Sequence, residues 1–189
     1  VNMTHKKLKL LTLTGFLLLV ATVSLSALHK DSISALDSDF SNGITVDSTL
    51  DTSDNNTGDT ICDDGDGNCT LRAAIEEANS NPDASTINFN ISGTADFSNG
   101  GEDGYTIALT SELPKFTTQV HLNGYSQPGS QANTAPAPQP INTKLLIEVD
   151  GSGIDMTSYY PFGLYFYTGS SNSSIRGLVI NGYTEGTAI

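Results

Sequence analysis

The chain has 189 residues, 37% of them hydrophobic, with 21 acidic residues against 8 basic ones and a formal net charge of −13. This length accommodates one domain of ordinary size with a stable core. So acidic a surface repels a phosphate backbone, which argues against nucleic acid as a partner. The charge either keeps the protein soluble or attracts cations, and the composition leaves both open.

The first 28 residues have the pattern of a secretory signal peptide. Three of the eight basic residues, all lysines, stand in the first ten positions and precede an apolar run over residues 10–23. Small residues then offer cleavage after Ser26 or Ala27. A retained membrane anchor is the alternative, although threonines within the run make it a poor span. We therefore expect a secreted or cell-surface protein that touches a membrane only through this segment, if it is uncleaved.

Residues 29–42 are polar and predict a solvated spacer, after which residues 43–48 alternate as in a short strand, with Ile44 and Val46 facing inward. Residues 71–78 then predict a helix of about ten residues, capped by Thr70 or Asn68 and docked through an apolar stripe. Its charged side chains are expected on the solvated face. The helix residues singled out are Leu71, Arg72, Ala74, Ile75 and Ala78.

Cys62 and Cys69 are the only cysteines of the chain. In an exported protein a disulfide between them is the simplest interpretation. A zinc site is the alternative, but two thiolates are too few ligands for zinc, and no histidine is near them in sequence. The bond would close an acidic loop. That loop either binds calcium without EF-hand geometry or is a solvated turn. The candidate calcium ligands are Asp63, Asp64, Asp66 and Asn68.

Beyond the helix, apolar residues alternate with period two in short runs, which predicts an all-β body. The runs are residues 86–91, 105–109, 120–122, 145–149, 164–166 and 175–180. Residues 127–142 contain four prolines and predict an extended surface loop. If the alternation of residues 164–166 continues to residue 167, the side chains of Tyr165 and Tyr167 point away from the core. There they either contact glycans or simply flank the core.

Residues 120–124, 147–151 and 178–182 share one form: apolar, any, apolar, Asn or Asp, Gly. A strand and turn recurring at roughly 30 residues predicts a solenoid; a sandwich with Asn-Gly hairpins is the alternative. Residues 186–189 resemble the start of another strand. The expectation is therefore that the chain is the N-terminal piece of a longer protein.

Residues 69–75, Cys-Thr-Leu-Arg-Ala-Ala-Ile, resemble the CSLREA domain, with Thr70 in place of its serine and Ala73 in place of its glutamate. Residues 174–182 resemble the right-handed parallel β-helix, of pectin-lyase type, that commonly follows such domains. The resemblance implies a cap over residues 43–92 and the first coils of the β-helix over residues 93–189. Proteins of this family are mostly exported or surface-attached bacterial proteins without an assigned reaction.

We therefore expect a structural, adhesive or glycan-binding role, with glycans or surface proteins as partners and calcium as the one cofactor considered. The alternative is a polysaccharide lyase or hydrolase whose catalytic coils lie beyond the C-terminus. Asp150, Lys144 and Arg176 have suitable chemistry, but their spacing assembles no catalytic set.

Overall fold

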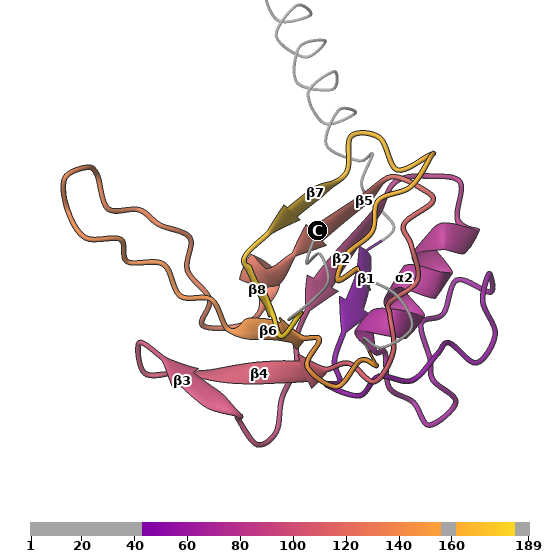
Figure 1. The fold of residues 1–189 in the computed structure, drawn as a ribbon, viewed down its shortest axis with the longest axis horizontal. Coiled ribbons are helices and arrows are strands. Elements are labelled where there is room, and N and C mark those ends of the chain that lie inside the picture. Colours follow the sequence, from indigo (N-terminus) through magenta and orange to yellow (C-terminus); the bar gives the residue numbers. More distant parts are fainter. Residues whose placement is uncertain (1–42, 156–161, 184–189) are drawn as a thin grey trace, which may run out of the picture. The chain divides into compact units, whose positions relative to one another are not determined.

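The computed structural model describes residues 43–155 and 162–183 (Figure 1). The elements, in chain order, are β1 (Gly43–Val46), α2 (Leu71–Ser80), β2 (Ser85–Phe89), β3 (Phe97–Asn99), β4 (Glu102–Ala108), β5 (Val120–Asn123), the 3-10 turn η1 (Gly124–Ser126), β6 (Ile147–Asp150), β7 (Ser174–Arg176) and β8 (Leu178–Asn181). The predicted signal peptide, the spacer and residues 186–189 lie outside the described residues. Within the described part, no helix is both long and apolar enough to cross a membrane.

The strands form two four-stranded sheets, ordered β1-β2-β5-β7 and β3-β4-β6-β8. All pairs in the first sheet are parallel, whereas the second combines parallel pairs with the antiparallel pair β3-β4. The register aligns apolar side chains across neighbouring strands, and these rows supply much of the core. One row consists of Ile44, Ile87, Leu122 and Ile175, and another of Ile107, Val149 and Ile180.

The predicted all-β, right-handed parallel β-helix is wrong. The described residues form an α/β arrangement of one α-helix and two small sheets, the second of them mixed. Two of the three similar segments are paired in register, because β6 and β8 are parallel neighbours with Asp150 opposite Asn181. The third segment contains β5, which lies in the other sheet between β2 and β7, so the three do not form one stack of successive repeats. Asn123 is thus in register with Asn88, not with Asp150. Any strand that buries alternate residues and ends in a glycine turn has this sequence form, so the form matched the pair β6–β8 but wrongly grouped β5 with them.

Most predicted strands are present with shifted ends, and three segments differ from the prediction. Residues 164–166 form only an isolated bridge, between Phe116 and Phe166. Residues 175–180 divide into β7 and β8 at Gly177, which has a φ of 73° and closely approaches the Tyr125 backbone, so only glycine fits. β3 was not predicted, because its three residues lack the alternation that marks a strand.

Helix α2 occupies the predicted residues and packs against β1 and β2. Its N-cap is Thr70, whose Oγ1 accepts a hydrogen bond from the Ala73 backbone N–H at 3.0 Å. The prediction that the charged side chains of this helix face solvent is wrong for two of them. Arg72 is 8% exposed and Glu77 5% exposed, so both are buried. Charge alone marked them as surface residues, and only their tertiary partners explain their burial.

The Arg72 guanidinium joins α2 to two distant loops. Its Nε donates to Asp51 Oδ1 at 2.9 Å, and its two terminal nitrogens donate to the carbonyl oxygens of Glu112 (2.7 Å) and Ser111 (3.0 Å). The other oxygen of Asp51 accepts from the backbone N–H and the hydroxyl of Thr110, both at 2.8 Å. The buried ion pair is thereby fully hydrogen-bonded, the condition under which such a pair is tolerated in a core.

Replacing Arg72 with alanine should destabilise the fold by about 3–5 kcal/mol, because Asp51 would remain buried without its cation. Arg176→Ala is the matched control, since the exposed Arg176 makes one hydrogen bond, to Asn123 Oδ1 at 2.9 Å. That change should cost about 1 kcal/mol or less. Urea denaturation measures both. Equal losses would show that the buried pair has no special role.

Candidate functional site

Cys62 and Cys69 form the predicted disulfide, with an S–S distance of 1.97 Å and a Cα–Cα distance of 5.1 Å. Both thiols are consumed by this bond, so the zinc alternative has no thiolate ligand left. The disulfide closes the acidic loop immediately before α2.

The carboxylates of this loop close its own turns. Asp63 Oδ1 accepts from the backbone N–H groups of Gly65 (2.8 Å) and Gly67 (2.9 Å). Both glycines have positive φ, 95° and 88°, which a side chain would disfavour. Asp63 therefore has a clear structural role in the loop.

Asp64 is the most strongly perturbed acid of the loop. Its carboxylate accepts hydrogen bonds from the backbone N–H of Asp66, the side chain and backbone of Asn68, and the Thr52 hydroxyl. These bonds, that of the Asp66 N–H foremost, lower the pKa of Asp64 to about 2. The anion is thus the form that holds the loop together.

The structure brings all four candidate calcium ligands into one short loop. Within the described ranges, however, no group of three or more His, Cys, Asp or Glu side chains is placed to hold a metal ion. Calcium binding at this loop stays a prediction.

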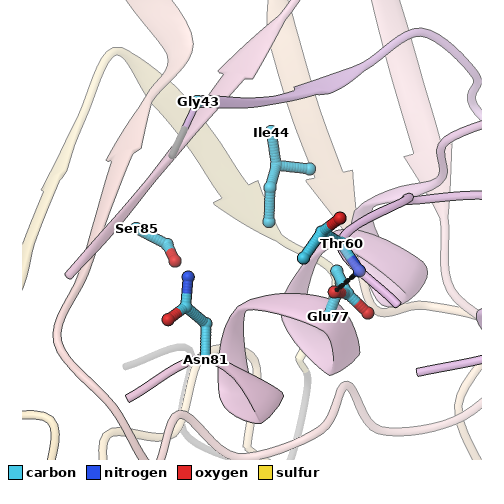
Figure 2. Close-up of a pocket in the computed structure, with 6 residues that line it drawn as sticks. All are labelled: Gly43, Ile44, Thr60, Glu77, Asn81 and Ser85. Atoms are coloured by element: carbon cyan, nitrogen blue, oxygen red, sulfur yellow. Dashed lines mark hydrogen bonds between the residues drawn. The ribbon is translucent and has the colours of Figure 1, made fainter. Parts of the chain in front are cut away.

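A small pocket lies where the end of α2 meets the starts of β1 and β2 (Figure 2). It is lined by Gly43, Ile44, Thr60, Glu77, Asn81 and Ser85 and has a volume of about 50 Å³. Glu77 accepts backbone hydrogen bonds from Gly58 and Thr60, and the buried Ser85 hydroxyl has no protein partner. Water occupies about 30 Å³, so this pocket suits one or two waters and is too small for a sugar ring.

Sequence reasoning did not predict this pocket. Asn81 follows a helix and Ser85 begins a strand, which are ordinary positions for both residue types. Their proximity comes from the packing of α2 on the first sheet, and no local pattern reports it.

His121 and Ser174 face each other on the paired strands β5 and β7, with Nδ1 and Oγ 2.8 Å apart. The amide nitrogen Nε2 of Gln119 lies 3.1 Å from His121 Nε2. These contacts link β5 to β7 through their side chains.

The residues weighed for an acid–base reaction are engaged separately. Lys144 Nζ pairs with Glu102 at 3.0 Å on the second sheet, and Arg176 hydrogen-bonds Asn123 on the first. Across the residues described, no hydrogen bond or ion pair joins either of them to Asp150. The structure therefore does not assemble these three side chains.

Two exposed tyrosines, a half-buried phenylalanine and a lysine lie together in a patch that we term the aromatic surface: Tyr165, Tyr167, Phe162 and Lys115. Tyr165 is 39% exposed and Tyr167 47% exposed. Tyr165 stacks on Phe162 with ring centroids 4.7 Å apart and meets Tyr167 edge-on at 5.9 Å. Lys115 Nζ lies 4.1 Å from the Tyr167 centroid, a cation–π distance.

The aromatic surface rests on a stacked pair of phenylalanines, the buried Phe116 and the partly buried Phe166. Phe116 donates its N–H to the Tyr165 carbonyl at 2.8 Å, and Tyr167 donates to the Phe116 carbonyl at 2.9 Å. This pairing stacks Phe166 on the fully buried Phe116 at 4.5 Å. Leu164 is also buried. Inward and outward side chains therefore alternate as predicted for this run.

Helix α2 positions the other half of the aromatic surface through Asn79. Its Nδ2 donates to the Lys115 carbonyl at 2.8 Å, and its Oδ1 accepts from the Thr117 backbone N–H at 2.8 Å. Sequence analysis singled out Tyr165 and Tyr167 but missed Phe162 and Lys115. Lys115 is distant in sequence, and Phe162 precedes the predicted run at residues 164–166.

Comparison with known protein families, curated proteins and solved structures finds no match to this chain. The likeness to the CSLREA domain therefore rests on its motif residues alone.

The lowered pKa of Asp64 predicts a specific acid sensitivity. A carboxylate whose pKa falls from 3.8 to about 2 on folding stabilises the fold above pH 4, and this contribution disappears as the pH falls through 2. Asp64→Asn keeps an acceptor oxygen but cannot titrate. Urea denaturation at pH 5 and pH 2 should show a smaller loss of stability in this variant than in the parent. Asp66→Asn is the control for the removal of one negative charge from the loop. Equal losses of stability in Asp64→Asn and in the parent would refute the assignment of the acid sensitivity to Asp64.

If the acidic loop binds calcium, about millimolar CaCl₂ should raise the thermal unfolding temperature, as for weak extracellular sites. Asp66→Asn should reduce that rise by removing one ligand. MgCl₂ at equal ionic strength is the control for charge screening. The absence of any calcium-specific shift in the parent would rule the loop out.

Proposed function

We propose that this chain is an exported or cell-surface protein that binds glycans through its aromatic surface, in a structural or adhesive role. The pattern of residues 1–28 supports export, as does the Cys62–Cys69 disulfide, because such bonds persist in oxidising compartments. The CSLREA-like motif supports the same location, since the proteins it resembles are mostly exported or surface-attached.

The observation that carries the binding proposal is the exposure of Tyr165 and Tyr167 beside Phe162. The apolar C–H faces of sugars pack on aromatic rings, and tyrosine hydroxyls and the Lys115 ammonium can hydrogen-bond sugar oxygens. The stacked pair Phe116–Phe166 and Asn79 hold the rings in place, which reduces the entropy lost on binding.

The CSLREA-like segment has a supporting role in this proposal. Arg72 anchors α2 to the loop at residues 110–112, and Asn79 at the other end of the helix holds Lys115 and Thr117. The helix thereby fixes the backbone on which the aromatic surface is built. We place no reaction at this segment.

Replacing both Tyr165 and Tyr167 with alanine should lower retention on immobilised polysaccharides at least tenfold, equivalent to about 1.4 kcal/mol, with little change in stability because both side chains are partly exposed. Affinity electrophoresis against plant, fungal and bacterial polysaccharides measures retention. The matched control is Tyr165→Phe with Tyr167→Phe, which keeps the rings and should keep most retention. Failure of the parent to bind any member of the panel, or equal retention by the alanine variant, would refute the proposal.

A further inference from the structure

A second exposed feature is an arm formed by residues 128–143, which leaves the body between η1 and β6. Figure 1 shows it as the salmon-to-orange loop that projects at the left, away from both sheets. At its base Gln127 is 3% exposed and makes two hydrogen bonds of 2.9 Å to the Ile91 backbone. The arm is therefore firmly rooted in the core.

The two sides of the arm are also joined to each other. Gln131 and Lys144 form an antiparallel bridge. Farther out, the Asn142 backbone N–H donates to Asn133 Oδ1 at 3.1 Å, and the Thr134 N–H donates to Asn142 Oδ1 at 2.9 Å. These bonds give the arm a defined course despite its exposure.

The tip of the arm is apolar and uncharged. It carries Pro136, Pro138 and Pro140, followed by Ile141, which is 75% exposed, the highest value among the exposed large hydrophobic residues of the described part. No Asp, Glu, Lys or Arg stands between Lys115 and Lys144. The Gln139 backbone N–H donates to the Pro136 carbonyl at 2.9 Å and closes a turn, so an aromatic surface would bind an already ordered tip at a low cost in entropy.

The chain itself offers such an aromatic surface. Its net charge of −13 makes two copies repel one another over most of their area. The uncharged arm and the aromatic surface with its Lys115 can meet without bringing acids together. Electrostatics therefore favours this pair of surfaces over other pairings between copies.

The contact must be between molecules. The aromatic surface is held by Asn79 near the end of α2, and Figure 1 shows α2 on the opposite side of the sheets from the arm. We propose that the arm of one copy docks on the aromatic surface of a second copy. Because different patches meet, the contact is head-to-tail and can extend into chains of molecules.

The salt dependence of the association distinguishes this contact from an ionic one. An apolar contact between like-charged molecules strengthens as added salt screens their repulsion, whereas a contact between opposite charges weakens. The purified full chain should therefore form larger species in sedimentation velocity as NaCl rises from about 0.05 to 0.5 M.

The decisive variant is Ile141→Asp, which places an acid in the tip without disturbing the core. It should weaken association about tenfold or more, as expected for loss of a central apolar contact. Ile61→Asp is the matched control, because Ile61 is 60% exposed and lies outside the arm. It should associate like the parent. All variants keep the same N-terminal segment, so association through that segment would be equal in all of them.

A mixing experiment tests both halves of the contact. The variant with alanine at Tyr165 and Tyr167 keeps the arm but lacks the aromatic surface. Ile141→Asp keeps the aromatic surface but has an altered arm. Each alone should show only the association common to all variants, and an equimolar mixture should add a complex of two molecules and no larger species. Association of Ile141→Asp as strong as that of the parent would overturn the proposal. So would association that falls with salt or that mixing does not restore.

The outcome is separable from glycan binding, although both use the same tyrosines. Ile141→Asp should retain glycans like the parent while losing association. Failure of the parent to retain any glycan would refute the proposed function and leave the self-docking standing. Unchanged association in Ile141→Asp would refute the self-docking and leave the proposed function standing.

Discussion

The buried Arg72 guanidinium is the contact on which the arrangement of the described residues depends. It neutralises Asp51, satisfies two carbonyl oxygens of the loop at residues 111–112, and so fixes that loop against α2. From there the chain runs to Lys115 and Thr117, which Asn79 holds at the other end of the same helix. A short helix would be unstable alone, and here its polar contacts position a surface built largely from residues far along the chain.

Electrostatics sets the second constraint. A chain with a net charge of −13 repels anions and its own copies, so contacts form most easily where charge is absent or reversed. The arm has no charged residue and the aromatic surface includes a lysine, which is why we propose these two places as interaction sites. Sugars and a neighbouring arm would compete for Tyr165 and Tyr167. Glycan binding and self-association would then be alternative states of one surface.

Local patterns predicted local structure well and pairing poorly. The four-residue stripe of α2, the Thr70 cap and the outward Tyr165 and Tyr167 follow from periodicities of a few residues. The partner of a strand is not encoded in this way. Residues 120–124 and 147–151 look alike because each buries alternate side chains before a glycine, yet they belong to different sheets. The predicted β-helix failed on that point.

The sequence by itself determined the helix and its cap, the disulfide between its only two cysteines, and most strand positions, because propensity, periodicity and composition act over short distances. Only the tertiary structure decided that Arg72 and Glu77 are buried, that Phe162 and Lys115 complete the aromatic surface, and that the arm stands apart from it. Those outcomes depend on partners brought together by sheet register and helix docking. The interaction energies that decide them arise between residues distant in the chain, so no short stretch of sequence predicts them.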